Sequence, residues 1–286
     1  MSEKGLTFYS RKREGIALKR GLNLNWAGCI SDISQSLDSL ILPRDDSKYI
    51  SDAINNNAAQ KKEWLKALKE YIRNNEGKII NGDFIEKVWF PEVESDVFIS
   101  HSHIDEEIAI KIKFLLEEKF NLSVFVDSVV WGNANDLLRE LDNNYCKNDR
   151  NHTYNYEKRN NTTAIVHLML ADALTKIMDQ SKYVFFLNTV NSTLKEGYEN
   201  EEQVTSPWIY HELVMTKYLQ DKQRMRPIQE GRDIRVSHTV DLSHLYKMDF
   251  ASFQGWVNLC TSKHYYKEKA LGKLDDIISG LCGRIR

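Results

Sequence analysis

Three short apolar runs separated by helical patterns are the feature that most constrains the fold of this chain. Residues 95–100 read SDVFIS, residues 122–127 read LSVFVD and residues 182–189 read KYVFFLNT, each rich in β-branched or aromatic residues. Between these runs, apolar residues recur with helical spacing over 105–120 and 168–179. Strands that are apolar throughout and alternate with helices are typical of a parallel sheet covered on both faces. The sequence therefore predicts an α/β fold.

The same alternation continues, more weakly, toward the C-terminus. The spacing predicts a helix over 208–219, a later strand over 234–242 (IRVSHTVDL), and closing helices within 252–260 and 269–282. We therefore expect about five parallel strands in a doubly wound sheet that spans residues 93–286.

Two further segments are predicted to lie outside this alternation. Residues 1–92 are expected to form a separate, mostly helical region of unknown role, because 30–41 and 58–72 have helical spacing of apolar residues. A long insertion is expected at about 142–163, which is polar, rich in Asn and without a period. Its tyrosines argue against simple disorder, since disordered segments are poor in aromatic residues.

Composition narrows the class of partner. The chain has 39 Lys and Arg against 41 Asp and Glu, a net charge of −2, which argues against a general nucleic-acid binder. The four cysteines form no CxxC pair, and His101 and His103 have no acidic or Cys cluster with ligand spacing beside them, so no metal site is predicted. No apolar leader and no stretch long enough to span a bilayer is seen, so we expect a cytoplasmic protein with no membrane partner.

Polar residues follow the first two predicted strands where each strand ends. Ligands of open α/β sheets bind outside the carboxyl ends of the strands, so these residues are candidates to hold a polar, planar ligand. The alternative is that the serines cap the next helix and the aspartate caps a turn. The predicted ligand-binding residues are Ser100, His101, Ser102, Asp127, Ser128 and Trp131.

Four motifs in order resemble a Toll/interleukin-1 receptor (TIR) domain. DVFISHSHID resembles the first strand and loop of that family, and VFVDSVVWG resembles its second strand and the start of its BB loop. ADALTKIMDQSKYVFFLNTVNS resembles its third helix and strand, and SPWIYHELVMTKYL resembles its Trp-x-x-x-Glu-Leu helix, here Trp208, Glu212 and Leu213. Together the motifs cover about 125 residues, and residues 1–92 lie outside the resemblance.

The resemblance implies a flavodoxin-like topology and an activity. Bacterial members of the family are commonly enzymes that cleave the nicotinamide–ribose bond of NAD⁺, as NAD⁺ glycohydrolases or ADP-ribosyl cyclases, in defence against phage. NAD⁺ would be the substrate, with no further cofactor. Expected partners are a second copy of the chain, another TIR protein or a protein that senses ADP-ribose. The alternative is a TIR module that assembles with another TIR protein and has no turnover.

The catalytic acid is the point at which the sequence departs from the family. The resemblance implies a catalytic glutamate on the helix after the BB loop, yet the helix before the third strand, LMLADALTKIMDQ, contains none. A carboxylate is needed there because it stabilises a ribosyl cation. We favour Glu140, which keeps the longer arm, with Asp136 and Asp172 as alternatives. Glu212 is interpreted as part of a structural motif.

Overall fold

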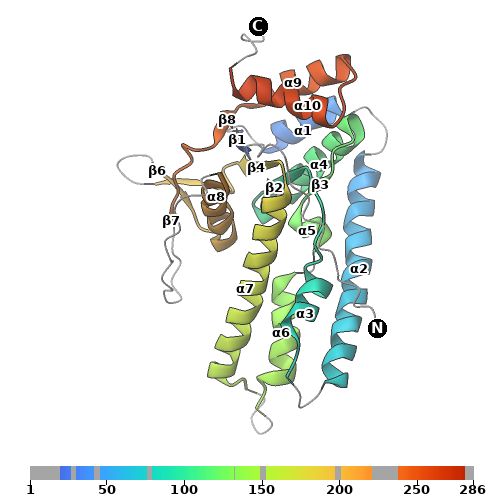
Figure 1. The fold of residues 1–286 in the computed structure, drawn as a ribbon, viewed down its shortest axis with the longest axis vertical. Helices are drawn as coiled ribbons and strands as arrows, with labels where there is room; N and C mark the ends of the chain where they lie inside the picture. Colours follow the sequence, from blue (N-terminus) through green and yellow to red (C-terminus); the bar gives the residue numbers. More distant parts are fainter. Residues whose placement is uncertain are drawn as a thin grey trace, which may run out of the picture.

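A five-stranded parallel sheet forms the centre of the chain in a computed structural model (Figure 1). The structure describes residues 20–26, 30–41, 46–75, 79–131, 133–148, 153–196, 201–220 and 238–280. The strands lie in the order β3-β2-β4-β1-β8 and every neighbouring pair is parallel. Their bounds are β1 Arg20–Asn25, β2 Val97–Ser100, β3 Val124–Phe125, β4 Tyr183–Asn188 and β8 Tyr246–Met248. The prediction of an α/β fold with a parallel sheet of five strands is confirmed.

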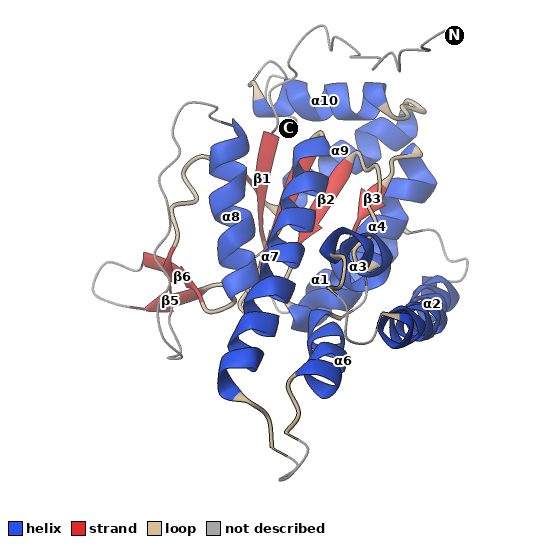
Figure 2. Cartoon of the chain, turned by 60° about the horizontal axis from the view of Figure 1, so that its bottom comes forward, coloured by secondary structure: helices blue, strands red, loops and turns tan. Residues whose placement is uncertain are grey.

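Helices cover both faces of this sheet. Because side chains alternate along a strand, Val97 and Ile99 contribute to the core on one face, with α1 (Ile30–Leu40), α4 (Glu106–Phe120), α9 (Phe250–Ser262) and α10 (Glu268–Ile278). Phe98 and Val184 contribute to a second core on the other face, where α7 (Tyr156–Gln180) packs. Figure 2 shows α7 and α8 (Pro207–Gln220) in front of the strands. The closing helices predicted near the C-terminus correspond to α9 and α10.

Strand β1 belongs to the part of the chain that was predicted to be a separate helical region. It pairs with β4 on one side and β8 on the other, with Leu22 opposite both Phe185 and Tyr246. Numbered along the chain, the five strands lie in the order 3-2-4-1-5, so the first strand of the chain takes the fourth place in the sheet. The flavodoxin order 2-1-3-4-5 has its fourth strand at this place. Leu22 and Leu24 are fully buried, so residues 1–92 include an integral strand of the sheet.

Helices of the N-terminal part also pack against the rest of the chain. In Figure 1, α2 (Asp46–Asn74), α3 (Gly82–Trp89), α6 (Ala134–Tyr145) and α7 lie side by side beyond the sheet. Leu68, Trp89 and Leu170 belong to one buried apolar cluster that joins these helices. The helices predicted at 30–41 and 58–72 are present, but their apolar faces are buried against the rest of the chain: α1 packs against α4, and α2 packs against α4 and α6.

The insertion predicted at about 142–163 is mostly helical. Helix α6 continues to Tyr145, α7 begins at Tyr156, and the Asn155 side chain caps α7 by accepting from the Lys158 N–H. The buried Asp142 carboxylate accepts from Thr162 Oγ1 at 2.5 Å and from Arg159 Nε at 2.9 Å. These hydrogen bonds between polar side chains hold the end of α6 against the start of α7. Because the contacts here are polar, the segment lacks the helical spacing of apolar residues from which helices are predicted.

A small antiparallel sheet lies outside the main one. It has the order β5-β6-β7, with β5 Leu194–Glu196, β6 Glu201–Val204 and β7 His238–Thr239. The strand predicted over 234–242 falls partly outside the described residues, and its described part belongs to this sheet. The prediction that it joins the parallel sheet is therefore wrong.

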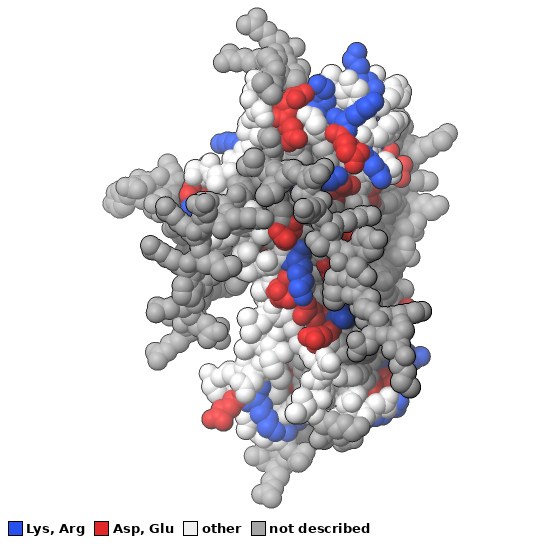
Figure 3. Space-filling model, viewed as in Figure 1, with Lys and Arg blue, Asp and Glu red and all other residues white. Residues whose placement is uncertain are grey.

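No described helix is long and apolar enough to cross a bilayer. Figure 3 shows Lys and Arg mixed with Asp and Glu on the face drawn, in keeping with the balanced composition.

An ion pair between the buried Lys111 and the partly exposed Asp38 joins α1 to α4. Lys111 Nζ lies 2.6 Å from Asp38 Oδ1, 2.7 Å from Ser34 Oγ and 3.4 Å from Glu107 Oε1. Burial acts to lower the pKa of the Lys111 ammonium, but Asp38 and Glu107 outweigh burial and raise it above its usual value. The ammonium thus stays charged in the folded chain and needs its acidic partners.

We expect Asp38→Ala to lower the free energy of unfolding by roughly 1.5–3 kcal/mol, because it leaves a buried charged donor short of a partner. Urea denaturation of the full chain measures this change. Gln35→Ala, at an exposed position of the same helix, is the control and should stay within about 0.5 kcal/mol of the wild type. Equal stability of the two variants would mean that the ion pair does not hold α1.

Candidate functional site

A pocket of about 450 Å³ opens at the carboxyl ends of β2 and β3. Its walls come from the segment after β2, the short helix α5 (Asp127–Val130), the start of α6, and parts of α2, α7 and α8. This is the edge at which the sequence placed a ligand site, and the volume falls within the usual range for small-molecule sites.

Glu212 on α8 is the most buried acid of the pocket. The residue is 5% exposed, and its Oε2 accepts a hydrogen bond from Ser100 Oγ at 2.5 Å. Burial raises the pKa of the Glu212 carboxyl, the negative charge of Asp127 raises it too, and the Ser100 hydrogen bond lowers it only in part, so that the pKa lies at about 8. At neutral pH the pocket therefore contains a carboxyl group that is mostly protonated.

The sequence places Glu212 in the pocket through the spacing of α8. Ile209 and Leu213 are buried in an apolar cluster with Phe186 of β4, which fixes the rotation of the helix. Trp208 and Glu212 are four residues apart, share one face of α8 and both line the pocket. Trp208 is half-buried and makes an edge-on contact with His167 of α7, with ring centroids 5.2 Å apart.

The two predicted serines at the end of β2 have different roles. Ser100 is buried and does not itself line the pocket, but it donates a hydrogen bond to Glu212, which does. Ser102 accepts from the Ile104 N–H and caps the short helix η1 (His103–Asp105), as the capping alternative predicted. Ser102 is therefore not among the described residues that line the pocket.

His101 and Asp127 line the pocket side by side. His101 Nδ1 lies 3.8 Å from Asp127 Oδ1, too far for a hydrogen bond. The His101 side chain is 3% exposed, and its Nε2 has no hydrogen-bond partner among the described residues. Ser128, whose N–H donates to Asp127 Oδ1, also lines the pocket. A buried ring nitrogen without a partner can bind a polar group of a ligand.

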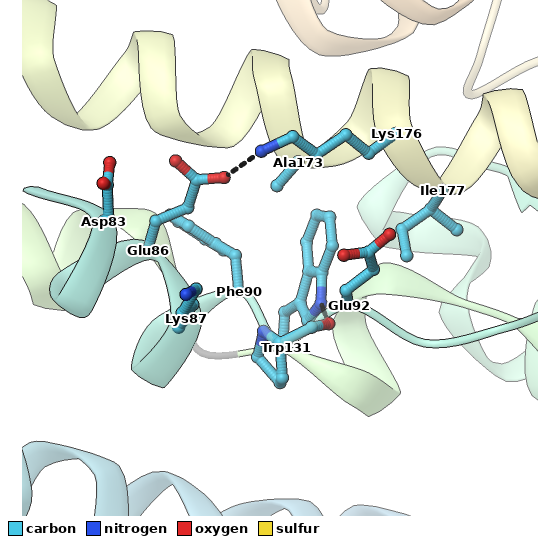
Figure 4. A pocket seen from close by; sticks show the side chains of 10 residues that line it. Asp83, Glu86, Lys87, Phe90, Glu92, Trp131, Ala173, Lys176 and Ile177 are labelled. Atoms are coloured by element: carbon cyan, nitrogen blue, oxygen red, sulfur yellow. Dashed lines mark hydrogen bonds and ion pairs between the residues drawn. The ribbon is translucent and has the colours of Figure 1, made fainter. Parts of the chain in front are cut away.

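Trp131 lies in the wall between this pocket and a second, smaller cavity. It is 2% exposed, packs edge-on against Phe90 and Phe125, and its Nε1 donates to the Pro91 carbonyl at 2.9 Å. Figure 4 shows the smaller cavity, about 240 Å³, with the Trp131 ring beside Phe90 and below the Glu86–Lys176 ion pair. The geometry makes Trp131 a packing residue, whereas Trp208 offers the pocket a more exposed ring.

None of the three acids predicted to be catalytic lines this pocket. Glu140, on α6, lies 3.5 Å from Lys69 Nζ and accepts from Asn144 Nδ2. Asp136 is exposed and pairs with Arg139 on the same helix. Asp172 is 56% exposed and pairs with Lys176 at 2.6 Å. All three carboxylates are part of ion pairs on helix surfaces.

The raised pKa of Glu212 makes stability depend on pH. The folded chain holds a proton that the unfolded chain releases above the ordinary pKa of 4.5. This contribution to stability is complete below about pH 4.5 and is lost as the pH rises to about 8, at up to about 1.4 kcal/mol per pH unit. We expect the free energy of unfolding of the wild type to fall over this window relative to Glu212→Gln, as measured by urea denaturation. A difference that does not change with pH would mean that Glu212 ionises normally.

Three of the lining residues that the sequence did not assign to the site can contribute to its chemistry: Glu212, Trp208 and Lys61. A charged residue inside the apolar stretch WIYHELVM was the available signal for Glu212, because a buried acid without a cationic partner is costly to keep.

Comparisons of the chain with protein-family models, with curated proteins and with solved structures find no match.

Proposed function

We propose that the chain cleaves the bond between nicotinamide and ribose in NAD⁺, with the side chain of Glu212 as the catalytic carboxylate. The observation that carries this proposal is the Glu212 carboxyl, buried in the pocket, with Asp127 close enough to raise its pKa. Paired carboxyl groups in a pocket are the equipment for breaking a glycosidic bond through a sugar cation.

The chemistry requires one carboxylate near the anomeric carbon. As the C–N bond breaks, its electron pair moves to the nicotinamide nitrogen, which becomes neutral, and positive charge develops on the ribose. The Glu212 carboxylate stabilises that charge. Water then attacks the anomeric carbon and loses a proton, so that NAD⁺ and water give ADP-ribose, nicotinamide and a proton. A hydroxyl group of the substrate in place of water would give a cyclic product.

The protonation of Glu212 fits a cationic substrate. Without a bound substrate the carboxyl is mostly protonated at neutral pH, which avoids a buried negative charge near the half-exposed Asp127 carboxylate. A bound nicotinamide ring carries a positive charge, which favours the ionised form of Glu212. Substrate binding therefore releases the proton and creates the carboxylate where it is needed.

The remaining walls suit the rest of the nicotinamide riboside. Trp208 and His167 offer aromatic rings for the planar base, and His101 Nε2 is available to a ribose hydroxyl. The resemblance to bacterial TIR domains extends the proposal to antiphage defence signalling, with catalysis in an assembled form of the chain.

Purified full-length chain incubated with NAD⁺ tests this proposal. We expect chromatography to show release of nicotinamide with ADP-ribose or a cyclic product, enhanced at high protein concentration or with a crowding agent. Absence of nicotinamide release under all these conditions would refute the proposal and favour a TIR module that acts by binding.

A further inference from the structure

A lysine from the N-terminal part of the chain lines the pocket. Lys61 lies on α2, outside the four motifs that resemble a TIR domain, yet it borders the same cavity as His101, Asp127 and Glu212. Among the described residues that line this pocket, Lys61 is the only Lys or Arg. Helix α2 therefore completes the site as well as the fold.

The packing of α2 fixes the direction of Lys61. Trp64, Leu65 and Leu68 follow it at spacings of three, four and seven residues, so all four residues share one face of the helix. Leu68 is buried in the core, and Trp64 and Leu65 pack against it. Because this face is held against the body of the chain, Lys61 lies at the pocket.

The charges around Lys61 leave it available to an anion. It forms no ion pair with any carboxylate whose side chain the structure describes. Glu106, which also lines the pocket, lies in the first turn of α4, where its negative charge offsets the positive end of the helix dipole. The N-terminus of α4 alone is therefore a poor site for an anion. The groups that can bind an anion here are the Lys61 ammonium and His101 Nε2, which has no hydrogen-bond partner among the described residues.

We propose that Lys61 binds a phosphate of the substrate and makes the pocket selective for nucleotides over nucleosides. This inference rests on the proposed function: with the nicotinamide riboside beside Glu212, its 5′-phosphate reaches toward the rim that α2 supplies. A lysine ammonium is a common phosphate ligand and acts as a point charge. NAD⁺ and nicotinamide mononucleotide carry this phosphate, and nicotinamide riboside lacks it.

Binding of inorganic pyrophosphate to the full chain tests the anion site without any turnover. By calorimetry at low salt, we expect Lys61→Met to weaken binding by about tenfold or more, because a charge-assisted hydrogen bond is lost. Glu106→Gln should strengthen binding, because a repelling carboxylate is removed. Lys62→Met, one residue along on an exposed position, is the matched control and should bind like the wild type.

Nicotinamide release measures the selectivity directly. Lys61→Met should lower kcat/KM for nicotinamide mononucleotide by about tenfold or more and leave kcat/KM for nicotinamide riboside unchanged. Wild-type affinity for pyrophosphate in Lys61→Met, an equal loss in Lys62→Met, or no binding by the wild type would overturn the inference. If pyrophosphate binding follows the expected order but no substrate releases nicotinamide, the anion site stands and the proposed function fails.

Discussion

Glu212→Gln is expected to lower kcat/KM for NAD⁺ by about 10²- to 10³-fold, because it removes the carboxylate that is proposed to lie beside the ribosyl cation and to stabilise it. Glutamine keeps the size of the side chain and can still accept the hydrogen bond from Ser100. Glutamine is also neutral, like the protonated form of Glu212 in the absence of substrate, so the fold should be retained. Nicotinamide release measures the loss, and circular dichroism checks the fold.

Glu140→Gln is the matched control for this prediction. Glu140 is the acid that the sequence favours, but it belongs to an ion pair with Lys69 outside the pocket. We expect its replacement to change kcat/KM by no more than about threefold, since its pair with the exposed Lys69 lies outside the pocket and contributes little. A large loss in Glu140→Gln together with near wild-type activity in Glu212→Gln would reverse the assignment of the catalytic acid.

Trp131→Ala is expected to lower the free energy of unfolding by about 3–5 kcal/mol. The indole is buried between Phe90 and Phe125, and its removal leaves both a cavity and an unpaired carbonyl at Pro91. Urea denaturation measures this loss, and Trp131→Phe, which keeps most of the ring volume, should lose less.

The outcome for Trp131 also separates two roles for this ring. The sequence predicts that it stacks on a planar ligand, whereas the structure buries both sides of it. If Trp131→Ala keeps its stability but loses affinity for NAD⁺, the ring serves the ligand and the packing role is wrong.

The strands that the sequence predicts are those with uninterrupted apolar side chains. β2, β3 and β4 are buried on both faces and are read directly from such runs. β1 reads RGLNLN, in which Asn23 interrupts the apolar run although it is itself buried. The Leu-Asn alternation has the period of a half-exposed strand, so it gives no sign of a place inside the sheet.

The location of the pocket was predictable, but its acid was not. The end of each strand can be predicted from the residues around it. Because the carboxyl ends of parallel strands meet at one edge of the sheet, Ser100 and Asp127 are predicted to lie at that edge. Glu212 follows β4 by more than twenty residues, and the rotation of α8 depends on packing against Phe186. Lys61 reaches the pocket through the packing of α2, which no local pattern specifies.

A structure of the Glu212→Gln variant with bound NAD⁺ tests the central claim most directly. We expect the nicotinamide riboside to fill the pocket between β2 and α8, with the residue 212 side chain within about 3.5 Å of the anomeric carbon. A ribose placed beside Glu140, Asp136 or Asp172 instead, with residue 212 still covered by packed side chains, would contradict it.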